Sequence, residues 1–198
     1  MRAVGRNVIL LVLLGGLLAG CVAVPFTAPS EEELYFPFPV SDDVAKKWRR
    51  QVVSYVSEEQ PGTIVVDTEQ RFLYLVMRDD KAVRYGVAVG KQGFSWKGEA
   101  TILRKAEWPT WTPPREMIAR RPELQRYASG MDGSPINPLG SRALYLYQDN
   151  VDTLYRLHGA GEPWTIGRAV SSGCVRLLND DIADLYERVP IGTKVVVL

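Results

Sequence analysis

The chain has 198 residues, of which 46% are hydrophobic and 24% charged, and its formal net charge is +1. This length and composition fit one globular domain with its own hydrophobic core, plus a terminal extension. The balanced charge, without a basic block, excludes a nucleic acid as the expected partner.

The first residues have the pattern of a lipoprotein signal peptide, which we place at residues 1–20. A short basic segment precedes the apolar stretch "VILLVLLGGLLAG", which ends in "LAGC" at Cys21. That ending resembles a bacterial lipobox, in which cleavage precedes the cysteine and its sulfur carries a diacylglycerol. We therefore expect an exported protein, anchored through Cys21 in the cell envelope without spanning the membrane. In an organism with two membranes, Val22 rather than Asp after the cysteine favours the periplasmic face of the outer membrane, by analogy with known lipoproteins. An ordinary secretory signal or an N-terminal anchor helix is the alternative.

Residues 21–40 are rich in proline, glutamate and small residues, so we interpret them as a linker that leads away from the membrane. An N-terminal helix is predicted for residues 41–60. Ser41 is a plausible N-cap, and apolar residues recur at helical spacing at Val44, Trp48 and Val52.

The remaining residues, 61–198, predict a single mainly β domain with two or three short helices. β-Branched and aromatic residues indicate strands in "TIVVD", "RFLYLVM", "AVRYGVAVG", "EATILRKAEWPTW", "ALYLYQ", "TLYRLH" and "GTKVVVL". Short helices are expected near residues 115–121 and, with Asn179 as its cap, in "NDDIADLYERV" at residues 179–189. Between them, residues 122–142 form a long excursion rich in Gly, Pro, Ser and Asn, and such segments in compact domains are often functional.

The chain has few candidates for a catalytic nucleophile, a general base or a metal ligand. It contains one histidine, His158, and two cysteines, of which Cys174 is the only thiol left if Cys21 carries a lipid. A structural zinc site needs four nitrogen or sulfur ligands, and neither a phosphate-binding loop nor a GxSxG nucleophile elbow is present. No metal or organic cofactor is therefore expected. A serine at position 171 or 172 could still use His158 as its base.

Cys174 in "SSGCVRL" and His158 fit a nucleophile and its general base. The imidazole would accept the thiol proton and later protonate a leaving amine. Gly173 would let the chain turn so that its N–H and that of Cys174 face a developing oxyanion, and the Gly159 carbonyl could hold the second ring nitrogen. Arg176 offers a fork for a carboxylate. The alternative is structural: the cysteine is a small core residue and the histidine a hydrogen-bonded one.

The segment that contains both residues closely resembles the end of the YkuD-type L,D-transpeptidase domain, the group that includes ErfK, YbiS, YcfS and YnhG. In that family an HG pair is followed, after a spacer of similar length, by S-[HS]-G-C-[IV]-R. The resemblance extends from about Thr63 to Leu198. The positions that match the motif are His158, Gly159, Ser171, Gly173, Cys174, Val175 and Arg176. Many members have His where this chain has Ser172.

The resemblance implies a β-sandwich-like catalytic domain that acts on peptidoglycan stem peptides. Cys174 would attack the carbonyl of the third stem residue, release the terminal D-alanine, and pass the acyl group to an amine of another stem peptide or of an envelope protein. If water takes the place of the amine, the same site makes an L,D-carboxypeptidase or a cross-link endopeptidase. A non-catalytic lipoprotein that binds the cell wall is the alternative from another class. The implied site consists of Cys174, His158 and Gly159 for catalysis, and Ser172, Gly173 and Arg176 for the oxyanion and substrate.

Overall fold

The structure is a computed structural model that describes residues 38–91 and 96–198, and its largest element is a nine-stranded β-sheet. Along this sheet the strands follow the order β1-β4-β3-β2-β11-β6-β7-β8-β10, while β5 and β9 form a separate pair. The strands are β1 (Gln51–Ser54), β2 (Ile64–Asp67), β3 (Phe72–Val76), β4 (Lys81–Gly86), β5 (Val89–Gly90), β6 (Gly98–Glu107), β7 (Arg142–Gln148), β8 (Val151–Ala160), β9 (Ala169–Ser171), β10 (Val175–Leu178) and β11 (Lys194–Val197).

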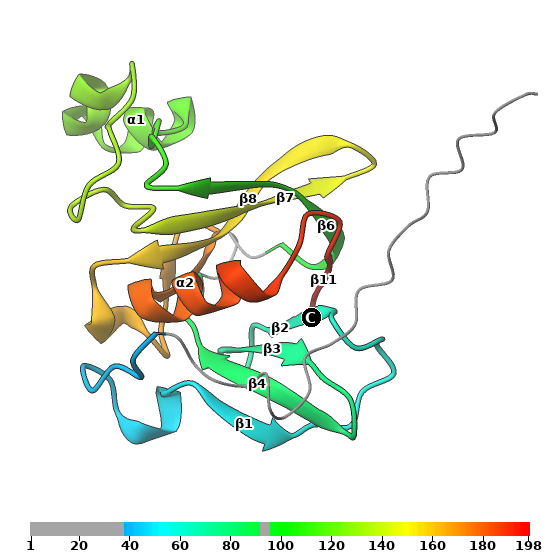
Figure 1. Cartoon of the computed structure of the whole chain (residues 1–198). Helices are drawn as coiled ribbons and strands as arrows, with labels where there is room; N and C mark the ends of the chain where they lie inside the picture. The colour runs from blue at the N-terminus through cyan, green and yellow to red at the C-terminus, as the bar shows by residue number, and fades with distance from the viewer. Residues whose placement is uncertain (1–37, 92–95) are drawn as a thin grey trace, which may run out of the picture.

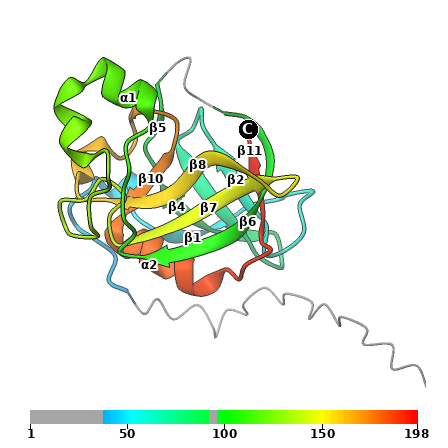
Figure 2. The ribbon, with the colours of Figure 1, turned by 90° about the horizontal axis from the view of Figure 1, so that it is seen from above.

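The large sheet bends so that its two halves lie on opposite sides of one core (Figures 1 and 2). Strands β1 to β4 form one half and β6, β7, β8 and β10 the other, with β11 joining them. Leu73 and Tyr85 from the first half and Leu144 and Leu157 from the second belong to one buried cluster. The mainly β, sandwich-like architecture expected from the sequence is confirmed, and each predicted strand segment contains a strand.

Helix α2 (Asn179–Arg188) closes the core beside β7 and β8 (Figure 1). Ile182 and Leu185 are fully buried, as the predicted apolar face of residues 179–189 requires. The predicted cap is wrong, because the residue before the helix is Leu178 and no side chain caps it. Asn179 instead accepts a hydrogen bond from the Ser141 backbone N–H at 2.9 Å, which ties the start of α2 to the start of β7.

The helix predicted for residues 41–60 is wrong. That stretch contains only a short 3₁₀ turn, η2 (Lys46–Trp48), and the edge strand β1. In β1 half-buried and exposed residues alternate, and the strand pairs antiparallel with β4. The β-branched residues of "QVVSYV" gain cross-strand partners there, and this tertiary pairing overrides the helical spacing of the apolar residues.

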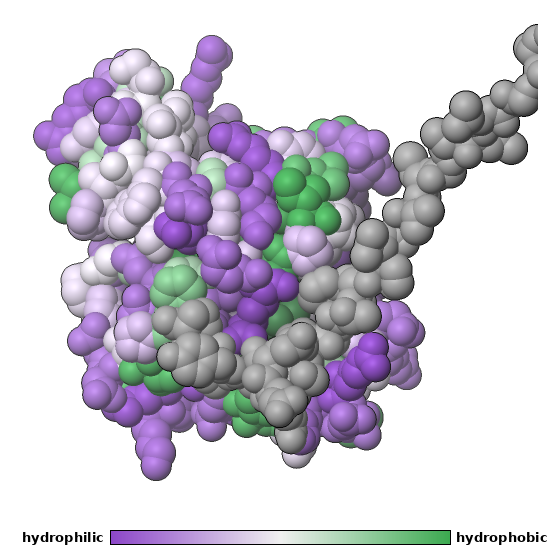
Figure 3. Space-filling view, in the orientation of Figure 1, coloured by the Kyte–Doolittle hydropathy of each residue, from purple (hydrophilic) through white to green (hydrophobic). Residues whose placement is uncertain are grey.

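A lobe between β6 and β7 stands out from one corner of the domain (Figures 1 and 3). It contains α1 (Arg115–Arg120), which confirms the short helix expected there, and the 3₁₀ helix η3 (Pro122–Tyr127). The buried amide of Asn137 donates hydrogen bonds to the carbonyls of Pro109, Met131 and Asp132. The long segment predicted for residues 122–142 is therefore held in place by one of its own side chains.

The predicted signal peptide at residues 1–20, the lipidation site Cys21 and nearly all of the linker lie outside the described residues, so they stay predictions. Within residues 38–91 and 96–198, no helix has the length and apolar character needed to cross a membrane.

Candidate active site

The register of two parallel strands brings the chain's histidine and Cys174 to the same face of the sheet. Strands β8 and β10 pair Leu157 with Val175 and His158 with Arg176. Leu157 and Val175 belong to the core, so the other pair lies on the opposite face. Cys174 directly precedes Val175. Cys174 lies one residue outside the strand, and continuing the alternation by that one position puts it opposite Arg156, on the face of His158 and Arg176.

His158 is only 4% exposed, and its orientation is set by its own neighbour. Nδ1 lies 2.6 Å from the carbonyl oxygen of Gly159, the contact expected from the sequence. A carbonyl can only accept, so Nδ1 carries the proton and Nε2 is left as a proton acceptor. Burial lowers the pKa of His158 to about 4, assisted by the charges of Arg176 and Arg156 and opposed by the Gly159 hydrogen bond. The imidazole is therefore neutral at pH 7.

Gly159 has no room for a side chain. A Cβ atom there would collide with Asn179 Oδ1 and would lie 3.1 Å from Ile182 Cγ2. Both of those residues belong to α2, so the absence of a side chain lets the helix pack directly against the strand that carries His158.

We expect Gly159→Ala to destabilise the fold by about 1–3 kcal/mol, the usual result of overpacking. It would also shift His158, because α2 must move away from β8 or the Gly159 carbonyl must turn. Urea unfolding checks the first effect. The matched control is Gly161→Ala in the same segment, where, in the part of the chain that the structure describes, a Cβ would meet just the Pro135 carbonyl at 3.2 Å. Equal stability of the two variants would contradict the prediction.

The turn that precedes Cys174 is held by the hydroxyl of Ser171. This group donates to the Cys174 carbonyl at 2.6 Å and accepts from the Gly173 N–H at 3.2 Å. Gly173 has φ +126°, a conformation that L side chains rarely adopt, which explains why glycine stands here. The Gly173 N–H is engaged by Ser171 here, and its expected role toward an oxyanion stays a prediction. Ser172 is exposed at the tip of this turn.

The thiol of Cys174 lies against the middle of β8. Its Sγ is 3.9 Å from the carbonyl oxygen of Leu154. Burial raises the pKa of the Cys174 thiol, while the backbone N–H of Arg156 and the charges of Arg156 and Arg176 act in the opposite direction. The sulfur is therefore a thiol at neutral pH, with stabilising groups already beside it.

Arg176 is fixed by contacts on both sides. Its backbone exchanges hydrogen bonds with Ala88 at 2.8 and 2.9 Å, and its Nη1 lies 2.8 Å from Glu162 Oε2. Glu162 immediately precedes the 3₁₀ turn η4 (Pro163–Thr165), where Trp164 is 64% exposed. Glu162 could not be identified as the partner of Arg176 from the sequence, because the two residues are 14 positions apart.

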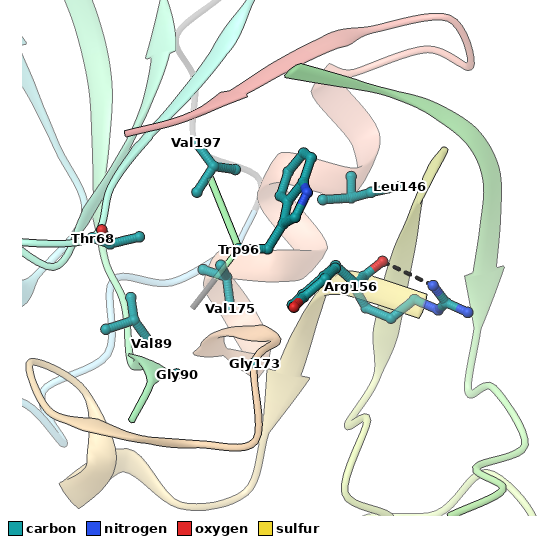
Figure 4. Close-up of a pocket in the computed structure, with 10 residues that line it drawn as sticks. Thr68, Val89, Gly90, Trp96, Leu146, Arg156, Gly173, Val175 and Val197 are labelled. Carbon is teal, nitrogen blue, oxygen red and sulfur yellow. Dashed lines mark hydrogen bonds between the residues drawn. The ribbon is translucent and has the colours of Figure 1, made fainter. Parts of the chain in front are cut away.

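A small cavity lies on the core side of this turn (Figure 4). Its volume is about 10 Å³, and Gly173, Val175 and Trp96 are among its lining residues. That is space for about one water molecule. The cavity is therefore too small to hold a peptide.

Known proteins resemble this chain over its β domain. Residues 61–197 match the model of the YkuD family, the L,D-transpeptidase catalytic domain. The probable L,D-transpeptidase ErfK/SrfK of Escherichia coli (strain K12) is 35% identical over 144 residues, which are 68% of this chain and 43% of that protein. The chain thus spans less than half the length of that relative.

Two solved structures are also similar. One, described as a probable carnitine operon oxidoreductase, CaiA, from Brucella melitensis, is 54% identical with a TM-score of 0.55, over 78% of this chain and 96% of that one. An L,D-transpeptidase from Mycobacterium smegmatis shares the fold, with a TM-score of 0.51 and 20% identity over 69% of this chain and 58% of that one. The family match covers well over half of the sequence, and the chain therefore belongs to the YkuD family of L,D-transpeptidase catalytic domains.

Proposed function

We propose that this protein is a peptidoglycan L,D-transpeptidase in which Cys174 is the nucleophile and His158 the general base. The observation that supports the proposal is the register of β8 and β10, in which His158 pairs with Arg176 and Cys174 is the residue directly before β10. The Gly159 carbonyl leaves Nε2 of His158 as the acceptor that a base needs. Membership of the L,D-transpeptidase family supports the reaction class.

In the first half-reaction the Cys174 sulfur attacks the carbonyl carbon of the third stem residue while its proton passes to Nε2 of His158. Because the pKa of His158 is lowered and that of Cys174 raised, both start neutral, and the proton moves as the S–C bond forms. The Cys174 N–H is the backbone donor that we assign to the oxyanion. His158 then gives the proton to the amine of D-alanine, the C–N bond breaks, and a thioester remains.

In the second half-reaction an acceptor amine attacks the thioester. His158 takes a proton from the amine and returns it to the sulfur as the thiol leaves. The acceptor is an amine of a second stem peptide or of an envelope protein. Arg176, whose guanidinium lies near His158, suits a carboxylate of the stem peptide that would take the place of Glu162.

Intact-mass spectrometry tests the proposal. Purified protein incubated with a stem tetrapeptide is expected to gain the mass of the tripeptide acyl group and to release one D-alanine per acyl group. Adding a stem peptide with a free amine should then give the amide product. If hydrolysed tripeptide is the only product when the amine is present, the same site is that of an L,D-carboxypeptidase. If no covalent adduct forms, the nucleophile assignment is wrong.

We also propose that Cys21 carries a lipid that holds the domain at the membrane surface of the cell envelope. The "LAGC" sequence supports this, and the chain enters the domain beside α2, where the Arg50 side chain donates to the Phe38 carbonyl at 2.5 Å. Metabolic labelling with palmitate should mark the wild-type protein, and a Cys21→Ser variant that kept the label would contradict the proposal.

A further inference from the structure

A row of side chains crosses the sheet and ends at the Cys174 sulfur. In the register of β6, β7 and β8, Arg104 pairs with Tyr145 and Tyr145 with Arg156. The two guanidinium groups lie 4.3 and 4.4 Å from the centre of the Tyr145 ring, which is 5% exposed. Cys174 follows Arg156 in the row, because the next residue, Val175, pairs with Leu157. The sequence contains one indication that Arg156 lies near the site. Arg156 and His158 are two positions apart, which places both on one face of a strand.

Arg156 is held firmly in this row. Its Nη1 and Nη2 contact the two carboxylate oxygens of Asp152 at 2.7 and 2.8 Å, and Nη1 also donates to the Tyr155 carbonyl. Figure 4 shows the guanidinium extending away from Val175 and Val197. The side chain is 13% exposed. An arginine that forms a two-point ion pair with a carboxylate and also stacks on an aromatic ring is held in one orientation. A lysine cannot make these two contacts in the same way.

The backbone between Asp152 and Arg156 is irregular and lies next to the Cys174 sulfur. The β7–β8 register shifts between Tyr145 and Tyr147, and Leu154 has φ +63°, which is unusual for a leucine. Asp152 accepts the Leu154 N–H at 2.8 Å, so the same carboxylate holds the bulge and the guanidinium. The Leu154 carbonyl is the group that lies 3.9 Å from Cys174 Sγ. A left-handed non-glycine residue costs about 1 kcal/mol or more, and it persists only where neighbouring contacts fix it.

We propose that Arg156 is a positioning residue for the nucleophile: clamped by Asp152 and Tyr145, it fixes the β8 bulge and holds its own N–H and positive charge against the Cys174 sulfur, so that the thiolate is stabilised as it forms. Among the described residues, the other charged groups that act on the sulfur are Arg176 from β10 and Asp152 from β8, and the neutral His158 lies on β8 opposite Arg176. The proposal deepens the proposed function. Its first test concerns only the thiol and does not depend on the substrate.

The test measures the rate at which iodoacetamide alkylates Cys174 as a function of pH. Mass spectrometry of the Cys174 peptide in the full-length protein separates this thiol from Cys21. We expect Arg156→Gln to move the midpoint of the profile upward by about 0.5–1 pH unit, a reduced effect for a nearby charge that Asp152 partly offsets. Arg156→Lys keeps the charge but loses the fork, so about half of that shift is expected. Arg104→Gln is the matched control, since it removes the outer member of the same stack and should leave the midpoint unchanged.

Turnover of a stem tetrapeptide gives the second readout. Arg156→Gln is expected to lower kcat several-fold with little change in KM, because the residue acts on the sulfur rather than on the substrate. An unchanged alkylation midpoint in a folded Arg156→Gln protein overturns the proposal, as does an equal shift in Arg104→Gln. If the glutamine variant does not fold, Arg156→Lys decides, and wild-type behaviour of that variant overturns the proposal. If wild-type protein forms no acyl-enzyme, the proposed function fails while the alkylation midpoints still decide the role of Arg156.

Discussion

Cys174→Ala is expected to abolish the covalent adduct and to lower D-alanine release from a stem tetrapeptide by about 10³-fold or more, as loss of a catalytic nucleophile usually does. Of the described residues, the two serines next to Cys174 are not placed to substitute. The Ser171 hydroxyl already donates to the Cys174 carbonyl and accepts the Gly173 N–H, and Ser172 points to solvent at the tip of the turn. Release of D-alanine, measured by a coupled assay or by mass spectrometry, gives the rate.

The same variant should fold normally, because Cys174 is partly exposed and lies outside the regular strands. Its thermal unfolding midpoint is therefore the control, and it should match that of the wild-type protein. Cys174→Ser adds a second comparison. A serine hydroxyl is a much weaker nucleophile without strong activation, so this variant should also be nearly inactive. Wild-type turnover by a folded Cys174→Ala protein would favour the serine alternative, with Ser171 or Ser172 using His158.

Local patterns in the sequence were enough to predict most of the fold. Strand β2 begins with three consecutive buried β-branched residues, Ile64 to Val66, a pattern that needs no knowledge of the partner strands. The buried face of α2 is equally local, because Ile182 and Leu185 recur at helical spacing. The motif around Cys174 was also readable, since its residues are consecutive and the chain has one histidine to pair with it.

Features that depend on pairing between distant segments could not be predicted. Residues 51–54 form a strand because β4 offers them an edge, and nothing local distinguishes them from one face of a helix. Asn179 does not cap α2, because its side chain accepts a hydrogen bond from the Ser141 N–H, 38 positions earlier in the chain. Arg156 likewise acquires its place beside Cys174 only through the register of β8 with β10. In each of these cases a long-range contact replaced the local interaction that the sequence suggested.

Asp184→Asn is expected to reduce the free energy of unfolding by about 3–5 kcal/mol, the usual cost of removing one partner from a buried ion pair. Asp184 is fully buried on α2 and faces two arginines. Its carboxylate lies 3.2 Å from Arg50 Nη1, accepts two hydrogen bonds from Arg188 at 2.9 Å, and accepts the Tyr85 hydroxyl at 2.8 Å. Asparagine keeps the size but removes the charge, so both guanidinium groups lose the carboxylate that offsets their burial. This cluster joins residues 38–50 and β4 to the helix that packs behind His158.

Asp181→Asn is the matched control, one turn away on the same helix, and the opposite outcome is expected. Arg50 Nη1 is 3.7 Å from Asp181 Oδ1, and among the described residues neither carboxylate oxygen of Asp181 accepts a hydrogen bond. Burial raises the pKa of Asp181 to about 7, and the nearby Arg50 only partly opposes this. A raised carboxyl pKa means that the folded state binds the proton more tightly than the unfolded state, so its contribution to stability is lost as the pH rises from about 4 through 7.

Urea unfolding at pH 5 and pH 8, followed by tryptophan fluorescence, therefore separates the two carboxylates. At pH 8 the wild-type protein must keep Asp181 ionised in the core, so Asp181→Asn should be at least as stable as the wild-type protein. At pH 5 the gain in stability of this variant over the wild-type protein should be smaller. Asp184→Asn should be strongly destabilised at both values. A loss of less than about 1 kcal/mol for Asp184→Asn, the size of a surface pair, would show that this cluster does not hold α2 in place. If both variants were destabilised equally, the two carboxylates would instead have to stabilise the buried charge of Arg50 together.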